Sequence, residues 1–343
     1  MAGIRGPSQE VVIDEQFTGA EPVRRTDRRN VVSVIGARGF LGRRVCAMLD
    51  RRGHEVHQFE RDEPPLTADG IDPRVLESDH VVWAASSINP LIAENDPDRV
   101  ALDLEAFRAF IEAARSDGEG PRTIILSSGG TVYDTSAEPP YSESSPARPR
   151  NAYGRAKREL ERILLSHDPA GFVLRVSNAY GPGQPVAPGQ GVIAHWMHAI
   201  ALGKDVHIFG DRDVARDFVY VDDIALAVVA VIEQDYRVHD VVNIGAGRPT
   251  TLGELLDAVA VTVGTRLEPV VHPARPFDAR STWLDCGRAA RTLGWRPVMP
   301  LLDGLAATWH AVTTPDTIQP AASGRRTAPS TSQRKSSRSE ADS

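Results

Sequence analysis

A tyrosine and a lysine one helical turn apart have the clearest chemical use in this sequence. Tyr153 and Lys157 lie in the segment YGRAKRELERILL, whose spacing of apolar residues predicts a helix. Residues four apart project from one face of a helix. A nearby ammonium favours the phenolate form of a tyrosine, so the pair could accept a proton from a hydroxyl whose carbon loses hydride. Taken alone, such a pair is also common on solvated helix faces.

Hydroxyl groups follow a predicted strand upstream of this pair. The strand TIIL runs into Ser127, Ser128, two glycines and Thr131. Open α/β sheets bind ligands at the carboxyl ends of their strands, where a hydroxyl can donate to a carbonyl oxygen formed during oxidation. Ordinary turn chemistry explains serine and glycine there equally well. Ser128 and Thr131 are therefore candidate donors.

A glycine-rich turn, GARGFLG, directly follows the apolar strand VVSVI and opens a predicted helix. Its first glycine permits a tight turn, the second lets the backbone approach a pyrophosphate, and the third allows helix and strand to pack closely. The helix N-terminus would face the phosphates with unpaired N–H groups. We predict dinucleotide binding through Gly36, Gly39, Phe40, Leu41 and Gly42. A purely structural turn is the alternative.

The end of the next strand, EVHQF, bears on the choice of cofactor. Glu60 lies about twenty residues beyond the glycine turn, where a carboxylate can accept hydrogen bonds from a ribose 2'-hydroxyl. This position favours NAD. Arg38 and Arg61 lie close by in sequence and could bind a 2'-phosphate, so NADP is the alternative. Arg61 also fits an ordinary surface charge.

Short apolar runs alternate with segments of helical spacing along the first half of the chain. Predicted strands are VVSVIG, EVHQF, HVVWAAS, TIILSS and FVLRVS, and predicted helices span 43–52, 100–115 and 153–166. Such alternation predicts an α/β fold, a Rossmann-type doubly wound parallel sheet with a smaller C-terminal substrate lobe. We assign 30–180 to the NAD-binding domain, with 208–246 returning to it, and 181–313 mostly to the substrate lobe.

Both ends of the chain lack the pattern of packed elements. Residues 1–29 and 314–343 are predicted to be a disordered leader and a disordered, mildly basic tail. No stretch of the sequence has the roughly 18 to 20 apolar residues of a membrane span, and no signal peptide is evident, so we expect a cytoplasmic protein. A net charge of -7 argues against non-specific nucleic-acid binding.

Neither cysteine nor histidine spacing predicts a metal site. Cys46 and Cys286 lie far apart and are interpreted as reduced thiols. His195 and His198 lie one helical turn apart, but no third ligand is evident near them.

Taken together, these motifs resemble the extended short-chain dehydrogenases, specifically the NAD-dependent epimerase/dehydratase family, which includes UDP-glucose 4-epimerase. The resemblance covers about residues 31–312 and includes, besides the segments above, LRVSNAYGPG, GDRDVARDFVYVDDIA, NIGAGRPTTLGEL and RPFDARSTWLDCGRAARTLGW. The order and spacing of these motifs are far more specific than any one of them.

This resemblance implies a role for particular residues. Tyr153 would be the acid/base and Lys157 its partner and a ribose ligand. Ala84 and Ala85 would line the cofactor, while Asn178, Arg216 and Arg275 would hold the nucleotide diphosphate of the substrate. Guanidinium groups suit phosphates, although a surface ion pair also explains Arg216. The resemblance further implies a homodimer through the helices at 100–115 and 153–166.

The sequence departs from the family pattern at several positions. Gly129 stands where the epimerases usually have the serine or threonine that polarises the sugar, so the donor role passes to Thr131 or Ser128. Gly130 and Thr131 replace the acidic residues of related dehydratases and decarboxylases, which argues against 4,6-dehydration. Asp103 stands where an asparagine is frequent, and the segment after Arg61 is shorter than in the family pattern, so the resemblance predicts the pyrophosphate contacts rather than the adenine and ribose contacts.

The leading hypothesis is a nucleotide-sugar 4-epimerase that oxidises the sugar transiently and has a nucleotide-diphosphate sugar as its small-molecule partner. An NADPH-dependent reductase of nucleotide 4-keto-6-deoxysugars is the second hypothesis. A non-catalytic NAD-binding sensor, motivated by Gly129 and Asp103, is the third.

Overall fold

A six-stranded parallel sheet forms the body of the molecule in the computed structural model, which describes residues 28–116, 118–234, 240–274 and 281–314. The strands are β1 (Val31–Ile35), β2 (Glu55–Phe59), β5 (His80–Trp83), β6 (Arg122–Ser128), β7 (Phe172–Val176) and β12 (Asp240–Ile244). They lie in the order β12-β7-β6-β5-β1-β2, and every neighbouring pair is parallel. The order reverses between β1 and β5, which is where open sheets of this type bind ligands.

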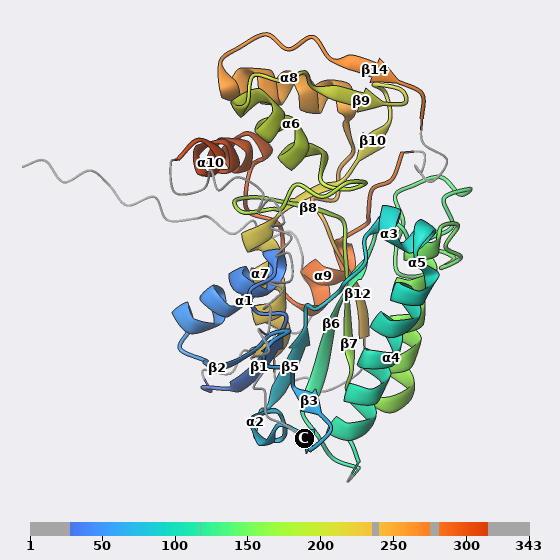
Figure 1. The fold of residues 1–343 in the computed structure, drawn as a ribbon, viewed down its shortest axis with the longest axis vertical. Coiled ribbons are helices and arrows are strands. Elements are labelled where there is room, and N and C mark those ends of the chain that lie inside the picture. Colours follow the sequence, from blue (N-terminus) through green and yellow to red (C-terminus); the bar gives the residue numbers. More distant parts are fainter. Residues whose placement is uncertain (1–27, 117, 235–239, 275–280, 315–343) are drawn as a thin grey trace, which may run out of the picture.

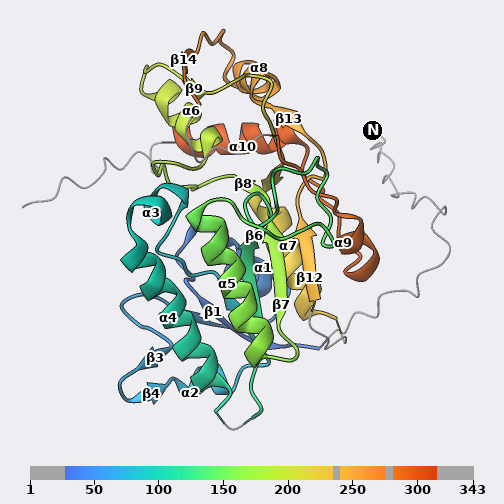
Figure 2. The same cartoon turned by 90° about the vertical axis from the view of Figure 1, so that its right-hand side faces the viewer.

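Helices cover both faces of the sheet (Figures 1 and 2). One face carries α1 (Phe40–Arg51) and α7 (Val221–Ile232), and the other carries α4 (Pro97–Ala114) and α5 (Ala152–His167). Because both faces are covered, the strands are almost continuously apolar. In β7, Leu174 packs into the core on the α1 side, whereas its neighbour Val173 packs into the core on the α5 side.

A smaller lobe lies over the carboxyl ends of the strands, at the top of Figure 1. It contains α6 (Val192–Ala201), α8 (Leu252–Val263), α10 (Leu301–Thr313), β9 (His207–Phe209) and β14 (Val270–His272). The three helices and β9 contribute to a separate core that includes Trp196, Leu255 and Leu305. The lobe therefore has a hydrophobic core of its own.

Short elements complete the description. The paired strands are β3 (Leu66–Thr67) with β4 (Gly70–Ile71), β8 (Asn178–Tyr180) with β11 (Phe218–Tyr220), and β10 (Ala215–Arg216) with β13 (Thr250–Thr251). The remaining helices are α2 (Pro73–Leu76), α3 (Pro90–Asn95) and α9 (Gly287–Thr292).

The predicted fold class is confirmed, and the helix starts differ by a few residues. The helix predicted from residue 100 begins at Pro97, since the Asp96 side chain accepts a hydrogen bond from the backbone N–H of Arg99. The domain boundaries stay a prediction, although β12 and α7 do return to the sheet. The predicted leader and tail lie almost wholly outside the described residues.

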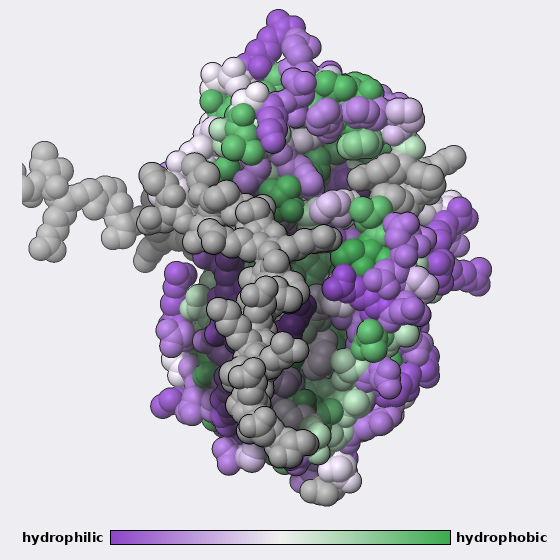
Figure 3. Space-filling view, viewed as in Figure 1, coloured by the Kyte–Doolittle hydropathy of each residue, from purple (hydrophilic) through white to green (hydrophobic). Residues whose placement is uncertain are grey.

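On the face shown in Figure 3, hydrophilic side chains cover most of both lobes and hydrophobic ones form small separate patches. Within the described ranges, no helix combines the length and the apolar character that a membrane span requires.

Candidate active site

A cavity of about 960 Å3 lies where the carboxyl ends of the strands meet the smaller lobe. Its wall is built from the glycine turn, the ends of β5 and β6, the start of α5, and β8, α6 and β9 of the opposite side. The predicted site residues on this wall are Gly39, Phe40, Leu41, Ala84, Ala85, Ser128, Thr131, Tyr153, Lys157, Asn178 and Arg216. Most of the predicted site is thus brought to a single cavity large enough for a nucleotide ligand.

Tyr153 and Lys157 project into this cavity from the first two turns of α5. Asn151 caps the helix, because its side chain accepts a hydrogen bond from the N–H of Gly154 at 2.7 Å. Lys157 is 8% exposed, and its Nζ lies 5.6 Å from the centre of the Tyr153 ring. The ammonium is therefore held beside the Tyr153 ring on the same wall, where it favours the phenolate form that can accept a proton from a bound hydroxyl.

The two candidate hydroxyl donors lie on the loop that the start of α5 touches. A Cβ atom on Gly154 would lie only 2.2 Å from the carbonyl oxygen of Thr131, so helix and loop pack backbone against backbone. The Thr131 hydroxyl donates to the Ser128 oxygen at 2.8 Å. This bond uses the proton of Thr131, so Ser128 keeps its own proton for a ligand.

The packing around Gly129 explains why this position holds no hydroxyl. A Cβ atom there would lie 2.5 Å from Cδ1 of Leu284 and 3.0 Å from the carbonyl oxygen of Arg175. Leu284 belongs to a small buried cluster with Val132 and Tyr133. The space of the usual donor is therefore filled by an apolar side chain.

The glycine turn has the geometry of a phosphate-binding loop. Gly36 has a φ of +83°, a conformation that L side chains rarely adopt, and its N–H donates to Phe59 at 2.9 Å. A Cβ atom on Gly42 would lie 2.1 Å from the carbonyl oxygen of Gly36. Gly39 is the N-cap of α1, and no side chain accepts a hydrogen bond from the first N–H groups of the helix there. A pyrophosphate fits this cradle.

Carboxylates surround the only arginine of the glycine turn. The guanidinium of Arg38 lies 3.3 Å from Oε1 of Glu60 and 3.6 Å from Oδ2 of Asp62. Glu60 is mostly buried, whereas Arg61 is exposed and Arg38 points largely into solvent. Two carboxylates against one guanidinium leave a negative charge where a 2'-phosphate would lie, which favours NAD over NADP.

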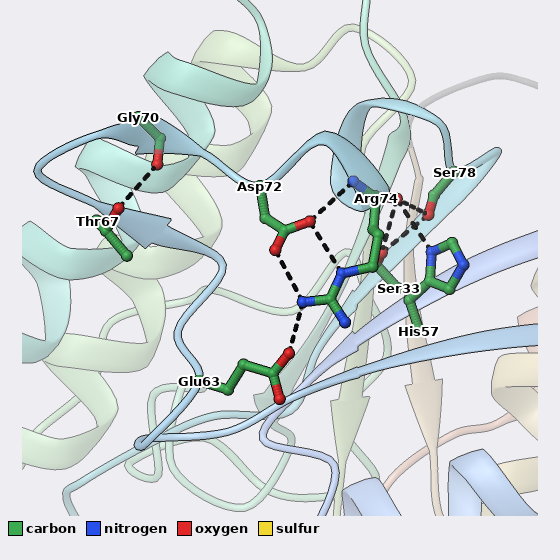
Figure 4. Close-up of polar contacts among 8 residues, drawn as sticks. All are labelled: Ser33, His57, Glu63, Thr67, Gly70, Asp72, Arg74 and Ser78. Atoms are coloured by element: carbon green, nitrogen blue, oxygen red, sulfur yellow. Dashed lines mark hydrogen bonds and ion pairs between the residues drawn. The ribbon is translucent and has the colours of Figure 1, made fainter.

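Arg74, shown in Figure 4, holds the segment after Glu60 together through several polar contacts. The Arg74 guanidinium binds Asp72 at 2.8 Å and Glu63 at 2.7 Å, and its carbonyl oxygen accepts from Ser78 at 2.8 Å. The carbonyl of Glu63 in turn accepts from the N–H of Glu60 at 3.1 Å. The Arg74 contacts and this backbone hydrogen bond therefore fix the turn that carries Glu60.

Asp103 has a structural reason for being an aspartate. Its carboxylate accepts hydrogen bonds from the N–H of Ser87 at 2.8 Å and the hydroxyl of Ser86 at 3.0 Å. These residues follow Ala84 and Ala85 in the loop after β5, which lines the cavity. Asp103 on α4 thus orders this loop, and the departure from asparagine leaves the wall intact.

Two of the three residues predicted to bind the diphosphate, Asn178 and Arg216, line the cavity. Asn178 lines the cavity and its Nδ2 donates to the carbonyl of Asp217 at 2.9 Å, while Arg216 reaches the wall from β10. Arg275 lies outside the described residues. Among the glycine-turn and ribose-end predictions, Gly36, Gly42, Glu60 and Arg61 do not line the cavity; Gly36 and Gly42 shape the turn beneath it.

Sequence reasoning missed residues that line the cavity and one, Asp217, that holds the segments around it. Asp217 is buried and accepts from the N–H groups of Ala246 and Leu284 at 2.6 and 3.2 Å, and burial raises the pKa of this carboxyl. Asp217 lies between β10 and β11 and ties this segment to the loop after β12. His195 and His207 also line the cavity, although His195 was considered only as a metal ligand. A periodicity analysis of α6 would have placed His195 on the same face as the cavity-lining Val192.

Residues 32–245 match the model of the NAD dependent epimerase/dehydratase family. The chain belongs to this family. A relative within it is the UDP-glucose 4-epimerase of Mycolicibacterium smegmatis, 31% identical over 315 residues that cover 80% of this chain and 96% of that one. A dTDP-4-dehydro-6-deoxyglucose reductase of Escherichia coli is 27% identical and covers 81% and 96%.

Solved structures of the family have the same fold. The UDP-glucose 4-epimerase of Thermotoga maritima, crystallised with UDP-glucose, superposes with a TM-score of 0.71 at 28% identity, covering 82% of this chain and 98% of that one. The Thermus thermophilus UDP-glucose 4-epimerase, in complex with NAD, gives 0.70 at 26% identity with the same coverage. The predicted family and the predicted cofactor, NAD, are confirmed, and the cradle at Gly36 fits that cofactor.

Proposed function

We propose that this chain is a nucleotide-sugar 4-epimerase of the UDP-glucose/UDP-galactose type. The observation that carries the proposal is the convergence of Tyr153, Lys157 and Ser128 with the glycine turn on one cavity. The similarity to the M. smegmatis UDP-glucose 4-epimerase over 96% of its length supports it. So does the similarity to the T. maritima epimerase with UDP-glucose.

Each residue has a task in this reaction. Tyr153, as the phenolate, removes the proton of the sugar 4-hydroxyl, and the ammonium of Lys157 stabilises that phenolate before it accepts the proton. The Ser128 hydroxyl, oriented by Thr131, donates to the developing carbonyl oxygen. NAD, when bound, supplies a hydride acceptor that can also return the hydride. After the keto sugar has rotated in the site, the hydride returns to its opposite face and Tyr153 gives its proton back. No net oxidation occurs.

The opposite wall binds the remainder of the substrate. Arg216 and Asn178 lie on the side of the cavity away from Tyr153's helix, in the elements β10 and β8. A guanidinium there neutralises a diphosphate and holds the sugar toward the phenol. We include Arg275 in this group on the family resemblance alone. We further propose that the protein acts in the cytoplasm and forms a homodimer. The dimer contact would be made by the outer faces of α4 and α5, where Leu102 of α4 is 64% exposed.

A reductase of nucleotide 4-keto-6-deoxysugars is the second candidate function. The E. coli relative that bears such a name favours it. The same residues would then deliver a proton to a keto sugar, and the cofactor would exchange after every turnover.

One assay separates the candidates. The purified protein is incubated with UDP-glucose, UDP-N-acetylglucosamine or their galacto counterparts, and the products are separated by chromatography. An epimerase interconverts at least one pair and releases NAD when denatured. Consumption of added NADPH with a 4-keto-6-deoxysugar nucleotide indicates the reductase. Bound NAD without turnover of any of these substrates contradicts both.

A further inference from the structure

A fully buried carboxylate lies on the helix that carries the proposed acid/base. Glu161 is 0% exposed and follows Tyr153 by eight residues and Lys157 by four, so the three share one face of α5. A buried carboxylate is costly unless each of its oxygens is hydrogen-bonded.

All donors to Glu161 are strong ones. The Ser127 hydroxyl donates to Oε1 at 2.6 Å, and the guanidinium of Arg175 donates to both oxygens, at 2.9 and 2.7 Å. Arg158 donates to Oε2 at 3.1 Å from the same helix. Arg175 is itself only 4% exposed, so this ion pair is shielded from solvent. We call Ser127, Glu161 and Arg175 the Glu161 cluster.

The Glu161 cluster connects the two halves of the proposed acid/base site. Ser127 lines the cavity and immediately precedes Ser128 at the end of β6. The register of the sheet places Ser127 opposite Arg175 of β7. The Glu161 carboxylate of α5 is therefore hydrogen-bonded to Ser127, at the strand end that presents the candidate donor Ser128.

The far end of the hydroxyl-bearing loop is held from the same cluster. The Arg175 guanidinium lies 4.9 Å from the centre of the Tyr133 ring, and Tyr133 follows Thr131 by two residues. The Tyr133 hydroxyl donates to Oδ1 of Asn243 on β12 at 2.6 Å. Ser127 at one end and Tyr133 at the other thus fix the loop that holds Ser128 and Thr131.

Stability alone does not account for this arrangement. Replacing a buried ion pair by apolar side chains of similar volume is often neutral or stabilising, because the desolvation of two charges offsets their attraction. The three hydrogen bonds from Ser127 and Arg175 do, however, fix the relative position of a helix and two strands better than apolar contacts do.

We propose that the Glu161 cluster positions Tyr153 and Lys157 of α5 against Ser128 and Thr131 of the β6 loop. This inference rests on the proposed function of the site. Glu161 and Arg175 touch no ligand in it; they act through the elements that they join. Removing the cluster should slow proton transfer without loosening the fold.

Three variants test the proposal. Glu161→Gln keeps the size of the side chain but removes its charge. The triple variant S127A/E161M/R175M replaces the whole cluster by apolar groups, so it leaves no buried charge unpaired and folds even where E161Q does not. Glu159→Gln is the matched control, since Glu159 lies on the same helix, pairs with Arg162 at 2.7 Å and is partly exposed.

The measurements are kcat and KM with the nucleotide sugar that the wild type converts, the dissociation constant of NAD by tryptophan fluorescence, and the thermal midpoint. We expect kcat of the triple variant to fall at least tenfold, with KM within twofold and the thermal midpoint kept, while E159Q behaves as wild type. A triple variant with wild-type kcat overturns the proposal.

A wild-type protein that binds NAD but converts no nucleotide sugar contradicts the proposed function instead. The NAD dissociation constant then decides the positioning role, because Lys157 and the glycine turn line the same cavity. A rise of at least threefold in the triple variant supports the role, and an unchanged constant overturns it.

Discussion

Leu284 occupies the space that a side chain at residue 129 would need. A Cβ atom on Gly129 would lie 2.5 Å from one δ-carbon of Leu284 and 3.2 Å from the other. The two residues are far apart in sequence and meet because the segment around Leu284 runs alongside Tyr141, whose N–H donates to Trp283 at 2.9 Å. The change at 129 is therefore coupled to a packing partner elsewhere in the chain.

Introducing a serine at residue 129 should destabilise the protein. Gly129→Ser forces an atom against Leu284, and overpacking of this kind costs about 1–3 kcal/mol. Adding Leu284→Ala should recover part of that loss by opening the space. Urea unfolding of the single and double variants measures both effects. A single variant as stable as the wild type contradicts the packing argument.

The hydroxyl donors should differ in their effect on turnover. Ser128→Ala removes the group that keeps its proton for the ligand, so kcat should fall about 100-fold or more. Thr131→Val removes only the bond that orients Ser128 at 2.8 Å, and a loss of about tenfold is expected. Steady-state kinetics of both variants rank them. The reverse order assigns the donor to Thr131.

Loss of the phenol should separate catalysis from cofactor binding. Tyr153→Phe should lower kcat by about 100-fold to 10,000-fold, since general acid–base catalysis contributes that much. The NAD released on denaturation should match the wild type, because the glycine turn is untouched. Activity within tenfold of the wild type would assign the proton transfer to another residue.

The carboxylates around Arg38 should control the choice of dinucleotide. In Glu60→Ala/Asp62→Ala the guanidinium loses both partners and the local negative charge disappears. Affinity for NADP relative to NAD should rise about tenfold, which corresponds to about 1.4 kcal/mol. Adding Arg38→Ala should abolish that gain. Fluorescence titration with both dinucleotides tests this, and an unchanged ratio refutes it.

The buried Asp217 should make stability depend on pH in a defined direction. Burial raises the pKa of this carboxyl above its unfolded value of about 3.9, although backbone N–H groups of Ala246, Leu284 and Gly247 oppose the shift. The folded state then holds the proton more tightly, so this contribution is present below about pH 4 and declines as pH rises through the folded pKa.

Asp217→Asn removes that titration. The unfolding free energy of the wild type minus that of Asp217→Asn should therefore be larger at about pH 4 than at about pH 7. Urea unfolding at both pH values provides the comparison, in which other titrating groups cancel. A difference that grows with pH contradicts the assignment.

Local patterns were sufficient for the body of the fold. Apolar runs such as VVSVI and helical spacing such as that of α5 depend on near neighbours in sequence, so strands, helices and the parallel sheet could be predicted. Helix starts moved because caps such as Asp96 act outside the periodic segment.

Contacts between distant segments were not predictable in the same way. Leu284 beside Gly129, Asp217 beneath Ala246, and the pairing of Glu161 with Arg175 all join residues that no local pattern relates. A charged residue inside an apolar strand, as in FVLRV, does signal a buried partner, and Arg175 could have been singled out on that ground.

The position of β12 has a consequence for synthesis of the chain. This strand pairs with β7, yet β8, α6 and β9 lie between the two in sequence. While the ribosome makes that intervening stretch, β7 pairs with β6 on one side only, and its other side is an apolar open edge of the kind that recruits other chains. The growing protein is therefore most prone to aggregate before residue 244 has emerged, and truncations within this interval should yield insoluble products.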